Sequence, residues 1–203
     1  PICANIGLVC VPVIERTRAL GVCFEPEPRN FAYLSRNIAR HGLSERISRH
    51  PIACHASAGR MQLALSPDNL GDHRLQRPSV DPASAALEAD ALARSTLWVQ
   101  TERLDDVLRD CVLPKPVVMK VDAQGSEASI FQGATETLAR VDHLITEYWP
   151  RGIVAHGDDS LSFAQHMRTF PYGAVLHVLP LPEPLHTSAY VFDQLNWLFK
   201  QDG

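Results

Sequence analysis

The chain has 203 residues, 45% of them hydrophobic and 21% charged, which is enough to bury one core, so we expect a single domain spanning residues 1–203. The formal net charge of −4, with no block of Lys or Arg, argues against a nucleic-acid partner. No apolar run approaches the roughly 20 residues of a spanning helix, and no basic and apolar leader opens the chain, so we expect no membrane association. Five cysteines without a C-x-x-C pair indicate reduced thiols in a cytoplasmic protein.

The predicted elements alternate between helices and strands along the chain. The first half is predicted to form a helix at 6–20, a strand at 22–24, a helix at 29–41 and a weaker strand at 47–53, which contains Pro51. Residues 66–93 hold three prolines and few large apolar side chains, which is typical of a surface excursion. The second half is predicted to form strands at 97–100, 117–121 and 143–147, helices at 104–111, 126–140 and 160–170, and final apolar runs at 174–179 and 190–199. This order predicts an α/β fold with a mainly parallel sheet covered on both faces.

Three acidic residues, Glu25, Asp122 and Glu147, follow predicted strands. Ligands of an open α/β sheet lie beyond the carboxyl ends of its strands. A carboxylate after the second strand can accept hydrogen bonds from both hydroxyls of a ribose, as an adenosyl cofactor presents; the alternative is that Glu25 caps a loop. The turn at 4–7 ends in Gly7, which lets the backbone approach a ligand. The full G-x-G-x-x-G pattern of a dinucleotide site is missing, which disfavours a nicotinamide oxidoreductase.

Five motifs stand in order along the chain: A-N-I-G at 4–7, F-E-P-E-P-R-N at 24–30, S-P-D-N-L-G-D-H-R at 66–74, K-V-D-A-Q-G-S-E at 120–127 and E-Y-W-P at 147–150. Together they resemble the FkbM family of S-adenosylmethionine-dependent methyltransferases over nearly the whole chain. The resemblance implies a Rossmann-like class I fold with a mainly parallel seven-stranded sheet and a C-terminal antiparallel hairpin. It also implies methyl transfer from S-adenosylmethionine to a hydroxyl of a sugar, glycan or polyketide-like small molecule, with residues 67–93 as a substrate-side insertion.

The resemblance assigns roles to residues in these motifs. The expected cofactor contacts are Asn5, Gly7, Glu25, Pro26, Ala53, Cys54 and Asp122. The expected substrate contacts are Asn69, Asp72, His73, Arg74, Lys120, Gln124 and Trp149. Because a general base must be an imidazole or carboxylate close to the reacting hydroxyl, the catalytic candidates are His73, Asp122 and Glu147. The alternatives are that His73 is a surface histidine and that Trp149 packs in the core.

One lysine, Lys120, and one glutamate, Glu127, are expected to have structural roles. Lys120 shares a strand face with Asp122, so we expect it to pair with Asp122 or Glu147. Glu127 stands in the first turn of a predicted helix, where a carboxylate caps free amides.

The first motif departs from the family pattern D-x-G-A-N-x-G, because Pro1 replaces Asp and Cys3 replaces Gly. This departure leaves open a non-catalytic binding module that has lost the cofactor; we expect instead a truncated or locally divergent N-terminal strand, since the chain begins without Met. A second alternative places Mg²⁺ between Asp122 and Glu147, whereas the leading expectation involves no metal. A small-molecule or glycan acceptor is the expected partner, and a homodimer is left open.

Overall fold

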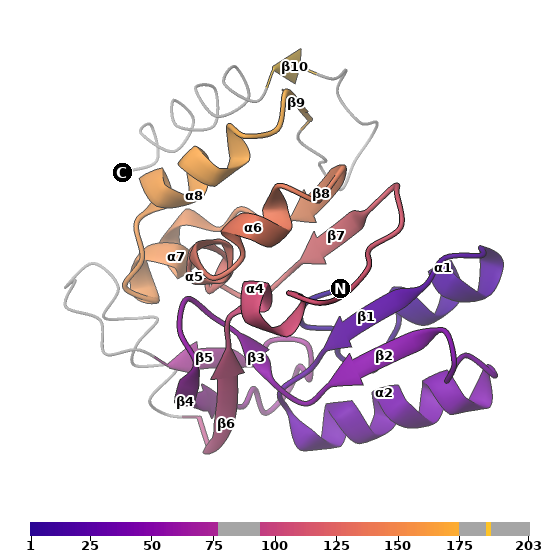
Figure 1. Ribbon diagram of the computed structural model, residues 1–203. Helices are drawn as coiled ribbons and strands as arrows, with labels where there is room; N and C mark the ends of the chain where they lie inside the picture. Colours follow the sequence, from indigo (N-terminus) through magenta and orange to yellow (C-terminus); the bar gives the residue numbers. More distant parts are fainter. Residues whose placement is uncertain (77–93, 175–185, 188–203) are drawn as a thin grey trace. The chain divides into compact units, whose positions relative to one another are not determined.

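The structure is a computed structural model and describes residues 1–76, 94–174 and 186–187 (Figure 1). The chain divides into two compact units, Pro1–Asp158 and Asp159–Gly203. The single domain expected from the sequence stays a prediction. Within the described residues, no helix is both long enough and apolar enough to cross a membrane.

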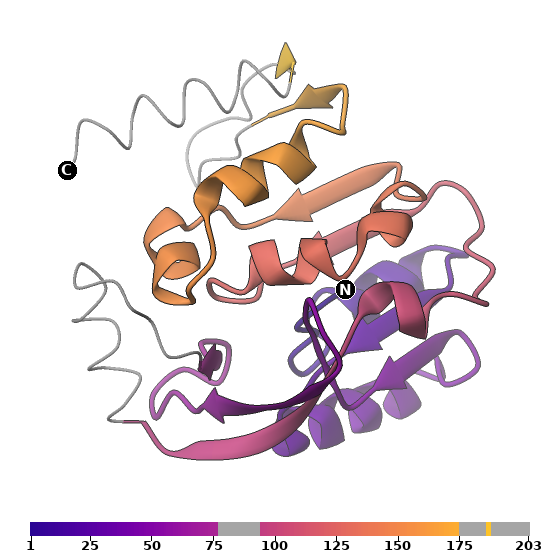
Figure 2. The same ribbon diagram turned by 60° about the vertical axis from the view of Figure 1, so that its left-hand side comes forward.

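The first unit alternates helices and strands, as expected for an α/β fold (Figures 1 and 2). Its helices are α1 (Cys10–Arg16), α2 (Pro28–Arg40), α4 (Leu104–Val107), α5 (Glu127–Gln132), α6 (Thr135–Leu138) and α7 (Pro150–Ala155). Its strands are β1 (Gly21–Phe24), β2 (Ile47–His50), β3 (Ala53–Cys54), β4 (Gly59–Ala64), β5 (Arg74–Gln76), β6 (Thr96–Glu102), β7 (Val118–Val121) and β8 (His143–Thr146).

The strands form small sheets in place of the expected parallel sheet of seven strands. Strand β1 pairs in parallel with β2, and β7 pairs in parallel with β8. Ile2 makes parallel bridges to Phe24 and Val121 and so links these two pairs. A separate mixed sheet has the order β3-β6-β4-β5, in which β4 runs antiparallel to both of its neighbours.

Proline and glycine positions explain several differences from the predicted elements. The predicted strand at 47–53 is split into β2 and β3, which pair with different strands, and Pro51, which has no N–H to donate, lies at the break. The predicted helix at 126–140 is split into α5 and α6 at Gly133, where a Cβ would lie 2.1 Å from the carbonyl oxygen of His55. The backbone at Gly133 therefore packs directly against the backbone at His55.

Helix α2 begins one residue before the predicted start at Arg29, and its first turn is well capped. The Glu27 side chain accepts a hydrogen bond from the Asn30 N–H at 2.6 Å, and Pro28 occupies a first-turn position. The apolar faces of α1 and α2 pack with β1 and β2 in one core cluster, whose buried members include Cys10, Val11, Ile14, Cys23, Leu34, Ile38 and Ile47. This core holds the ends of β1 and α2 in place beside the site described below.

The second unit contains α8 (Ser160–Met167) and the short antiparallel pair β9 (Tyr172–Gly173) and β10 (His186–Thr187). Asp159 caps α8 by accepting a hydrogen bond from the Leu161 N–H at 2.9 Å. The apolar runs predicted to form the C-terminal hairpin, 174–179 and 190–199, lie outside the described residues except for Ala174. The hairpin predicted from them is therefore untested.

Candidate active site

A cavity opens at the carboxyl ends of β1, β3 and β7, the edge at which an α/β sheet presents its ligand site. Most of the side chains predicted from the sequence line this cavity: Asn5, Glu25, Pro26, Ala53, Cys54, His73, Lys120, Asp122 and Gln124. Six predicted residues do not line it: Gly7, Asn69, Asp72, Arg74, Glu147 and Trp149. Four of these six, Asp72, Arg74, Glu147 and Trp149, still contact one another or residues of the lining, as described below.

Glu25 follows β1 and is 4% exposed. Its Oε2 accepts a hydrogen bond from the Asn5 N–H at 2.7 Å, and its Oε1 accepts one from the Glu27 N–H at 3.0 Å. Burial raises the pKa of Glu25 to about 7, although these two backbone donors favour the charged form. A carboxylate fixed in this way presents its remaining lone pairs to the cavity.

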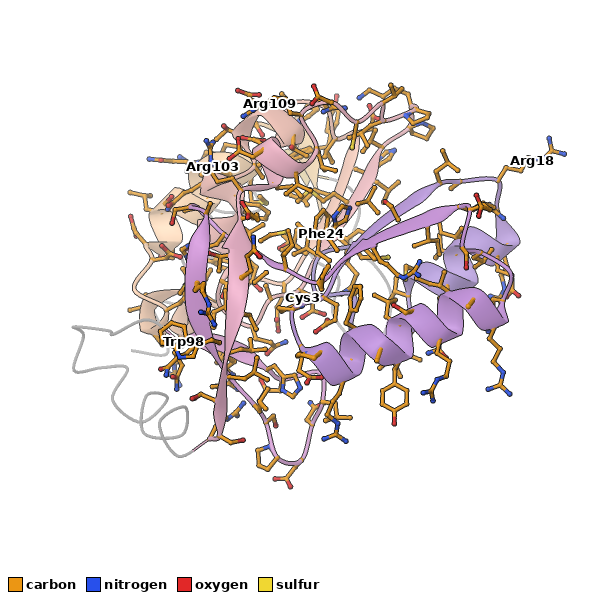
Figure 3. The ribbon with its side chains drawn as sticks, turned by 60° about the horizontal axis from the view of Figure 1, so that its bottom comes forward. Cys3, Arg18, Phe24, Trp98, Arg103 and Arg109 are labelled. Atoms are coloured by element: carbon orange, nitrogen blue, oxygen red, sulfur yellow. The ribbon has the colours of Figure 1, made fainter. Side chains whose placement is uncertain are left out.

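The bend at residues 3–7 forms the wall of the cavity beside Glu25. Cys3 and Asn5 have φ angles of 55° and 50°, and Gly7 has a φ of 93°, so all three adopt left-handed conformations. A Cβ at Gly7 would lie 2.9 Å from a methyl group of Val11, so glycine also permits close packing there. Cys3 is half-buried near Phe24, whereas Arg18 and Arg109 lie at the periphery of the molecule (Figure 3). The bend therefore carries a strained cysteine at the position where the family pattern has glycine.

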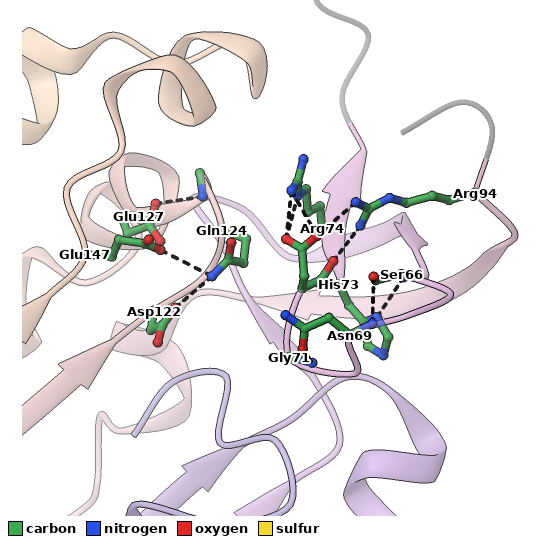
Figure 4. A network of polar contacts seen from close by, with 12 residues as sticks. Ser66, Asn69, Gly71, His73, Arg74, Arg94, Asp122, Gln124, Glu127 and Glu147 are labelled. Atoms are coloured by element: carbon green, nitrogen blue, oxygen red, sulfur yellow. Dashed lines mark hydrogen bonds and ion pairs between the residues drawn. The ribbon is translucent and has the colours of Figure 1, made fainter. Parts of the chain in front are cut away.

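A polar cluster of Asp122, Gln124 and Glu147 forms the opposite wall (Figure 4). The Gln124 amide donates to Asp122 Oδ1 at 3.0 Å and to Glu147 Oε2 at 3.3 Å, so one amide bridges two carboxylates. Lys120 Nζ lies 2.9 Å from Asp122 Oδ2, the pairing predicted from their shared strand face. Partial burial, followed by the negative charge of Asp122, raises the pKa of Glu147.

Glu127 shapes the loop that carries this cluster. It is fully buried, and its two carboxylate oxygens accept hydrogen bonds from the N–H groups of Ala123 at 2.7 Å and Gly125 at 2.9 Å. Burial raises its pKa to about 7. Glu127 does not line the cavity. Its role is the capping of loop amides that the sequence indicates.

The loop at 66–73 reaches the cavity from the side of α2. The carbonyl oxygen of Leu70 accepts hydrogen bonds from Asn5 Nδ2 and from Asn30 Nδ2, each at 3.0 Å. Within the loop, Asn69 Oδ1 accepts from the Gly71 N–H at 2.9 Å. Two amide side chains from different elements therefore hold this loop at one carbonyl group.

His73 lines the cavity and has a defined ring orientation. Its Nδ1 accepts a hydrogen bond from the Ser66 N–H at 3.1 Å. A neutral ring must then carry its proton on Nε2. Burial lowers the pKa of His73, which favours this neutral form. The ring is therefore arranged as a hydrogen-bond donor.

A second group of side chains lies beside the cavity and contains Asp72, Arg74, Arg94 and Trp149. Arg74 binds both oxygens of Asp72 at 2.9 Å, and Arg94 Nη2 binds Asp72 Oδ2 at 2.9 Å (Figure 4). The Arg74 guanidinium also lies 4.9 Å from the centre of the Trp149 ring. Trp149 folds over Gly152, where any Cβ would come 2.1 Å from the indole. The group thus contributes a planar aromatic and two cations.

Sequence reasoning missed two parts of the site, Asn30 and the Leu70 carbonyl group. Asn30 is 2% exposed and lines the cavity beside Glu25. Its position as the last residue of the F-E-P-E-P-R-N motif was the available signal, since a polar residue in an apolar helical face requires a partner. The role of Leu70 depends on a backbone oxygen, which side-chain patterns do not reveal.

The fold and this cavity define an α/β protein with acidic and amide groups arranged around a cavity at the carboxyl ends of its strands. The crystal structure of Methyltransferase FkbM from Methylobacillus flagellatus KT matches with a TM-score of 0.53 at 17% identity, covering 87% of this chain and 39% of that chain. This likeness supports the fold.

Residues 2–170 match the family model described as the Methyltransferase FkbM domain. The chain therefore belongs to the FkbM methyltransferase family. The 2-O-methyltransferase NoeI of Sinorhizobium fredii (strain NBRC 101917 / NGR234) is 28% identical over 169 residues, which are 81% of this chain. The chain spans 63% of the length of that relative.

Proposed function

We propose that this protein transfers a methyl group from S-adenosylmethionine to a hydroxyl of a sugar, glycan or polyketide-like small molecule. The observation that carries the proposal is the Glu25 carboxylate, held by two backbone N–H groups and facing the cavity at the end of β1. The name of NoeI, a 2-O-methyltransferase, supports an oxygen acceptor.

The residues present fit the nucleoside half of this cofactor. Each oxygen of Glu25 has one backbone donor, which leaves lone pairs for the two ribose hydroxyls. Ala53 and Cys54, which form β3, line the cavity and would flank the adenine. At the amino-acid end the fit is incomplete, because Pro1 has no carboxylate for the cofactor's amino group and Cys3 adds a thiol to the wall.

The chain's own task is to align the acceptor oxygen, exclude water and remove one proton. S-adenosylmethionine, when bound, supplies a methyl group already activated on a sulfonium. We assign the proton to the carboxylate pair of Asp122 and Glu147: Asp122 faces the cavity, and Glu147 has the raised pKa that suits a general base. Lys120 compensates the charge of Asp122, and the Gln124 amide holds the pair together.

His73 has a different role in this proposal from the base considered in the sequence analysis. Its Nδ1 lone pair is occupied by the Ser66 N–H, so the neutral ring offers only the Nε2–H group. We assign His73 to orient the acceptor by donating a hydrogen bond to one of its oxygens. The Trp149 ring, stacked with Arg74 beside the cavity, offers a surface for a sugar ring.

The test is methyl transfer from labelled S-adenosylmethionine to a panel of oligosaccharides and hydroxylated polyketides, followed by mass spectrometry. We expect transfer to an oxygen, a loss of kcat of about 100-fold in Glu147→Gln, and retained kcat in His73→Gln, which keeps a side-chain donor. Turnover is also measured in the presence of a metal chelator, because the Mg²⁺-dependent alternative predicts that chelation abolishes it. Absence of transfer together with absence of S-adenosylhomocysteine binding would overturn the proposal.

The second candidate is a binding module that keeps the acceptor site without the cofactor. Pro1 and Cys3 favour it, because both change the wall that would face the methionine part of the cofactor. Calorimetric titration with S-adenosylhomocysteine separates the two candidates, since only the methyltransferase requires measurable binding.

A further inference from the structure

The Asn30 side-chain amide makes a hydrogen bond through its nitrogen but, among the described residues, none through its oxygen. Its Nδ2 donates to the Leu70 carbonyl oxygen at 3.0 Å. Its Oδ1 is buried and has no hydrogen-bond partner among the residues that the structure describes. The whole residue is 2% exposed and lines the cavity beside Glu25. An amide oxygen is therefore held without a donor at the wall of the proposed cofactor site.

This arrangement carries a free-energy cost that a ligand can remove. A buried polar atom without a partner costs about 1–3 kcal/mol. Rotation of the amide would not relieve Oδ1, because it would place that oxygen against the Leu70 carbonyl oxygen and break the hydrogen bond from Nδ2. The neighbouring Glu25 carboxylate only accepts hydrogen bonds when it is ionised. With Glu25 ionised, no described residue supplies this donor, so a molecule bound in the cavity can supply it.

We propose that Asn30 Oδ1 accepts a hydrogen bond from a ribose hydroxyl of the cofactor and that Asn30 thereby couples the cofactor site to the acceptor loop at 66–73. The inference rests on the proposed function, because it requires an adenosyl ligand beside Glu25. A ribose presents two hydroxyl donors, and Glu25 and Asn30, which both line the cavity, each carry an acceptor oxygen. Asn30 is then a cofactor-binding residue that the sequence motifs did not assign.

Asn30 can couple the cofactor site to the loop at 66–73 because its Oδ1 and Nδ2 belong to the same planar amide. A ligand donor at Oδ1 polarises the amide and strengthens the hydrogen bond that Nδ2 donates to Leu70. That hydrogen bond fixes the loop in which Ser66 orients the His73 ring. Asn5 holds the same carbonyl oxygen but its Oδ1 already accepts from the Ile6 N–H at 2.6 Å, so it has no comparable open end. Cofactor binding should consequently order the acceptor loop through Asn30.

The test compares Asn30→Ala with the wild type and with Ser35→Ala. Ser35 lies on the same helix, where it accepts a hydrogen bond from Arg49 at 2.9 Å, and it does not line the cavity. We expect Asn30→Ala to weaken binding of S-adenosylhomocysteine and of 5′-methylthioadenosine about tenfold, and Ser35→Ala to leave both affinities unchanged. Hydrogen exchange at residues 66–73 should slow on addition of S-adenosylhomocysteine in the wild type and in Ser35→Ala, but not in Asn30→Ala.

Thermal unfolding with and without S-adenosylhomocysteine separates ligand contact from a structural role. A merely structural Asn30 would lower the melting temperature equally in both conditions, whereas the proposed contact reduces the ligand-induced rise. Equal ligand-induced rises, or a loss of affinity for S-adenosylhomocysteine but not for 5′-methylthioadenosine, would overturn the inference. Failure of the wild type to bind either ligand would instead overturn the proposed function on which the inference rests.

Discussion

Two buried glutamates, Glu25 after β1 and Glu127 after β7, hold their loops by the same device but face different surroundings. Each accepts hydrogen bonds from two backbone N–H groups, and burial raises the pKa of each to about 7. Glu25 lines the cavity, whereas Glu127 is fully enclosed by protein. Of the two carboxylates, only Glu25 therefore keeps part of its hydrogen-bonding capacity open to the cavity, where the proposed function places a ligand.

The largest expected effect is on stability, from Glu127→Ala. This change leaves the N–H groups of Ala123 and Gly125 without their buried acceptor, so we expect the free energy of unfolding to fall by about 3 kcal/mol. Urea unfolding measures it. Glu136→Ala, at an exposed position of α6, is the matched control and should change the value by less than about 0.5 kcal/mol. A loss of less than about 1 kcal/mol at Glu127 would contradict the scaffolding role.

The second-largest expected effect is on ligand affinity, which should depend on Glu25 and not on Glu127. Glu25→Gln removes one acceptor oxygen and the charge that would bind the ribose, so we expect S-adenosylhomocysteine affinity to fall about 30-fold. Glu127→Gln should change affinity less than about threefold, because Glu127 does not reach the cavity. Calorimetric titration of both variants decides the matter. Equal losses would mean that Glu25 acts only as a scaffold.

Stability and ligand affinity should depend on pH in different ways, because both glutamates affect stability but only Glu25 affects affinity. Because the folded pKa of both glutamates is raised from about 4.5 to about 7, the folded state holds the extra protons; stability from this source is fully present below pH 4.5 and is lost as the pH rises through 7. Ligand affinity should move in the opposite direction. Protonation of Glu25 removes a lone pair and its charge, so affinity should fall about tenfold from pH 8 to pH 6.

The control for that pH profile is Glu127→Gln, which should retain the loss of affinity at low pH, while Glu25→Gln should abolish it. The other ionisable groups around Glu25 are Glu27 and Cys3, and Glu147 lies near Glu127. An affinity that is flat between pH 6 and pH 8 in the wild type would mean that Glu25 carries no ligand-linked proton.

Local patterns predicted the elements whose ends are set by local chemistry. The helix predicted at 29–41 is α2, because Glu27 and Pro28 fix its start. The strand predicted at 117–121 is β7 with one residue fewer. The five motifs also indicated the family, and most of the residues taken from them lie around one cavity.

Sequence patterns failed where a contact between distant segments decides the structure. Nothing local marks β4 as the antiparallel neighbour of β6, and the break at Gly133 depends on the His55 carbonyl group. In the site, the orientation of His73 depends on the Ser66 N–H, and the contact to Asn30 depends on the Leu70 oxygen. Backbone partners of this kind have no signature in side-chain spacing.

The smallest expected effect lies at the bend that holds Glu25, in Cys3→Gly. Cys3 adopts a φ of 55°, which costs a residue with a Cβ about 1–2 kcal/mol, while glycine adds about 0.5–1 kcal/mol of chain entropy to the unfolded state. The net expectation is a gain in stability of about 0.5 kcal/mol, measured by urea unfolding. Cys3→Ala removes the thiol but keeps the strain, so it separates the two contributions. Cys3→Gly could instead prove less stable than Cys3→Ala. Packing of the side chain at residue 3 would then outweigh the backbone strain, and the Cys3 side chain would help to support the bend beside Glu25.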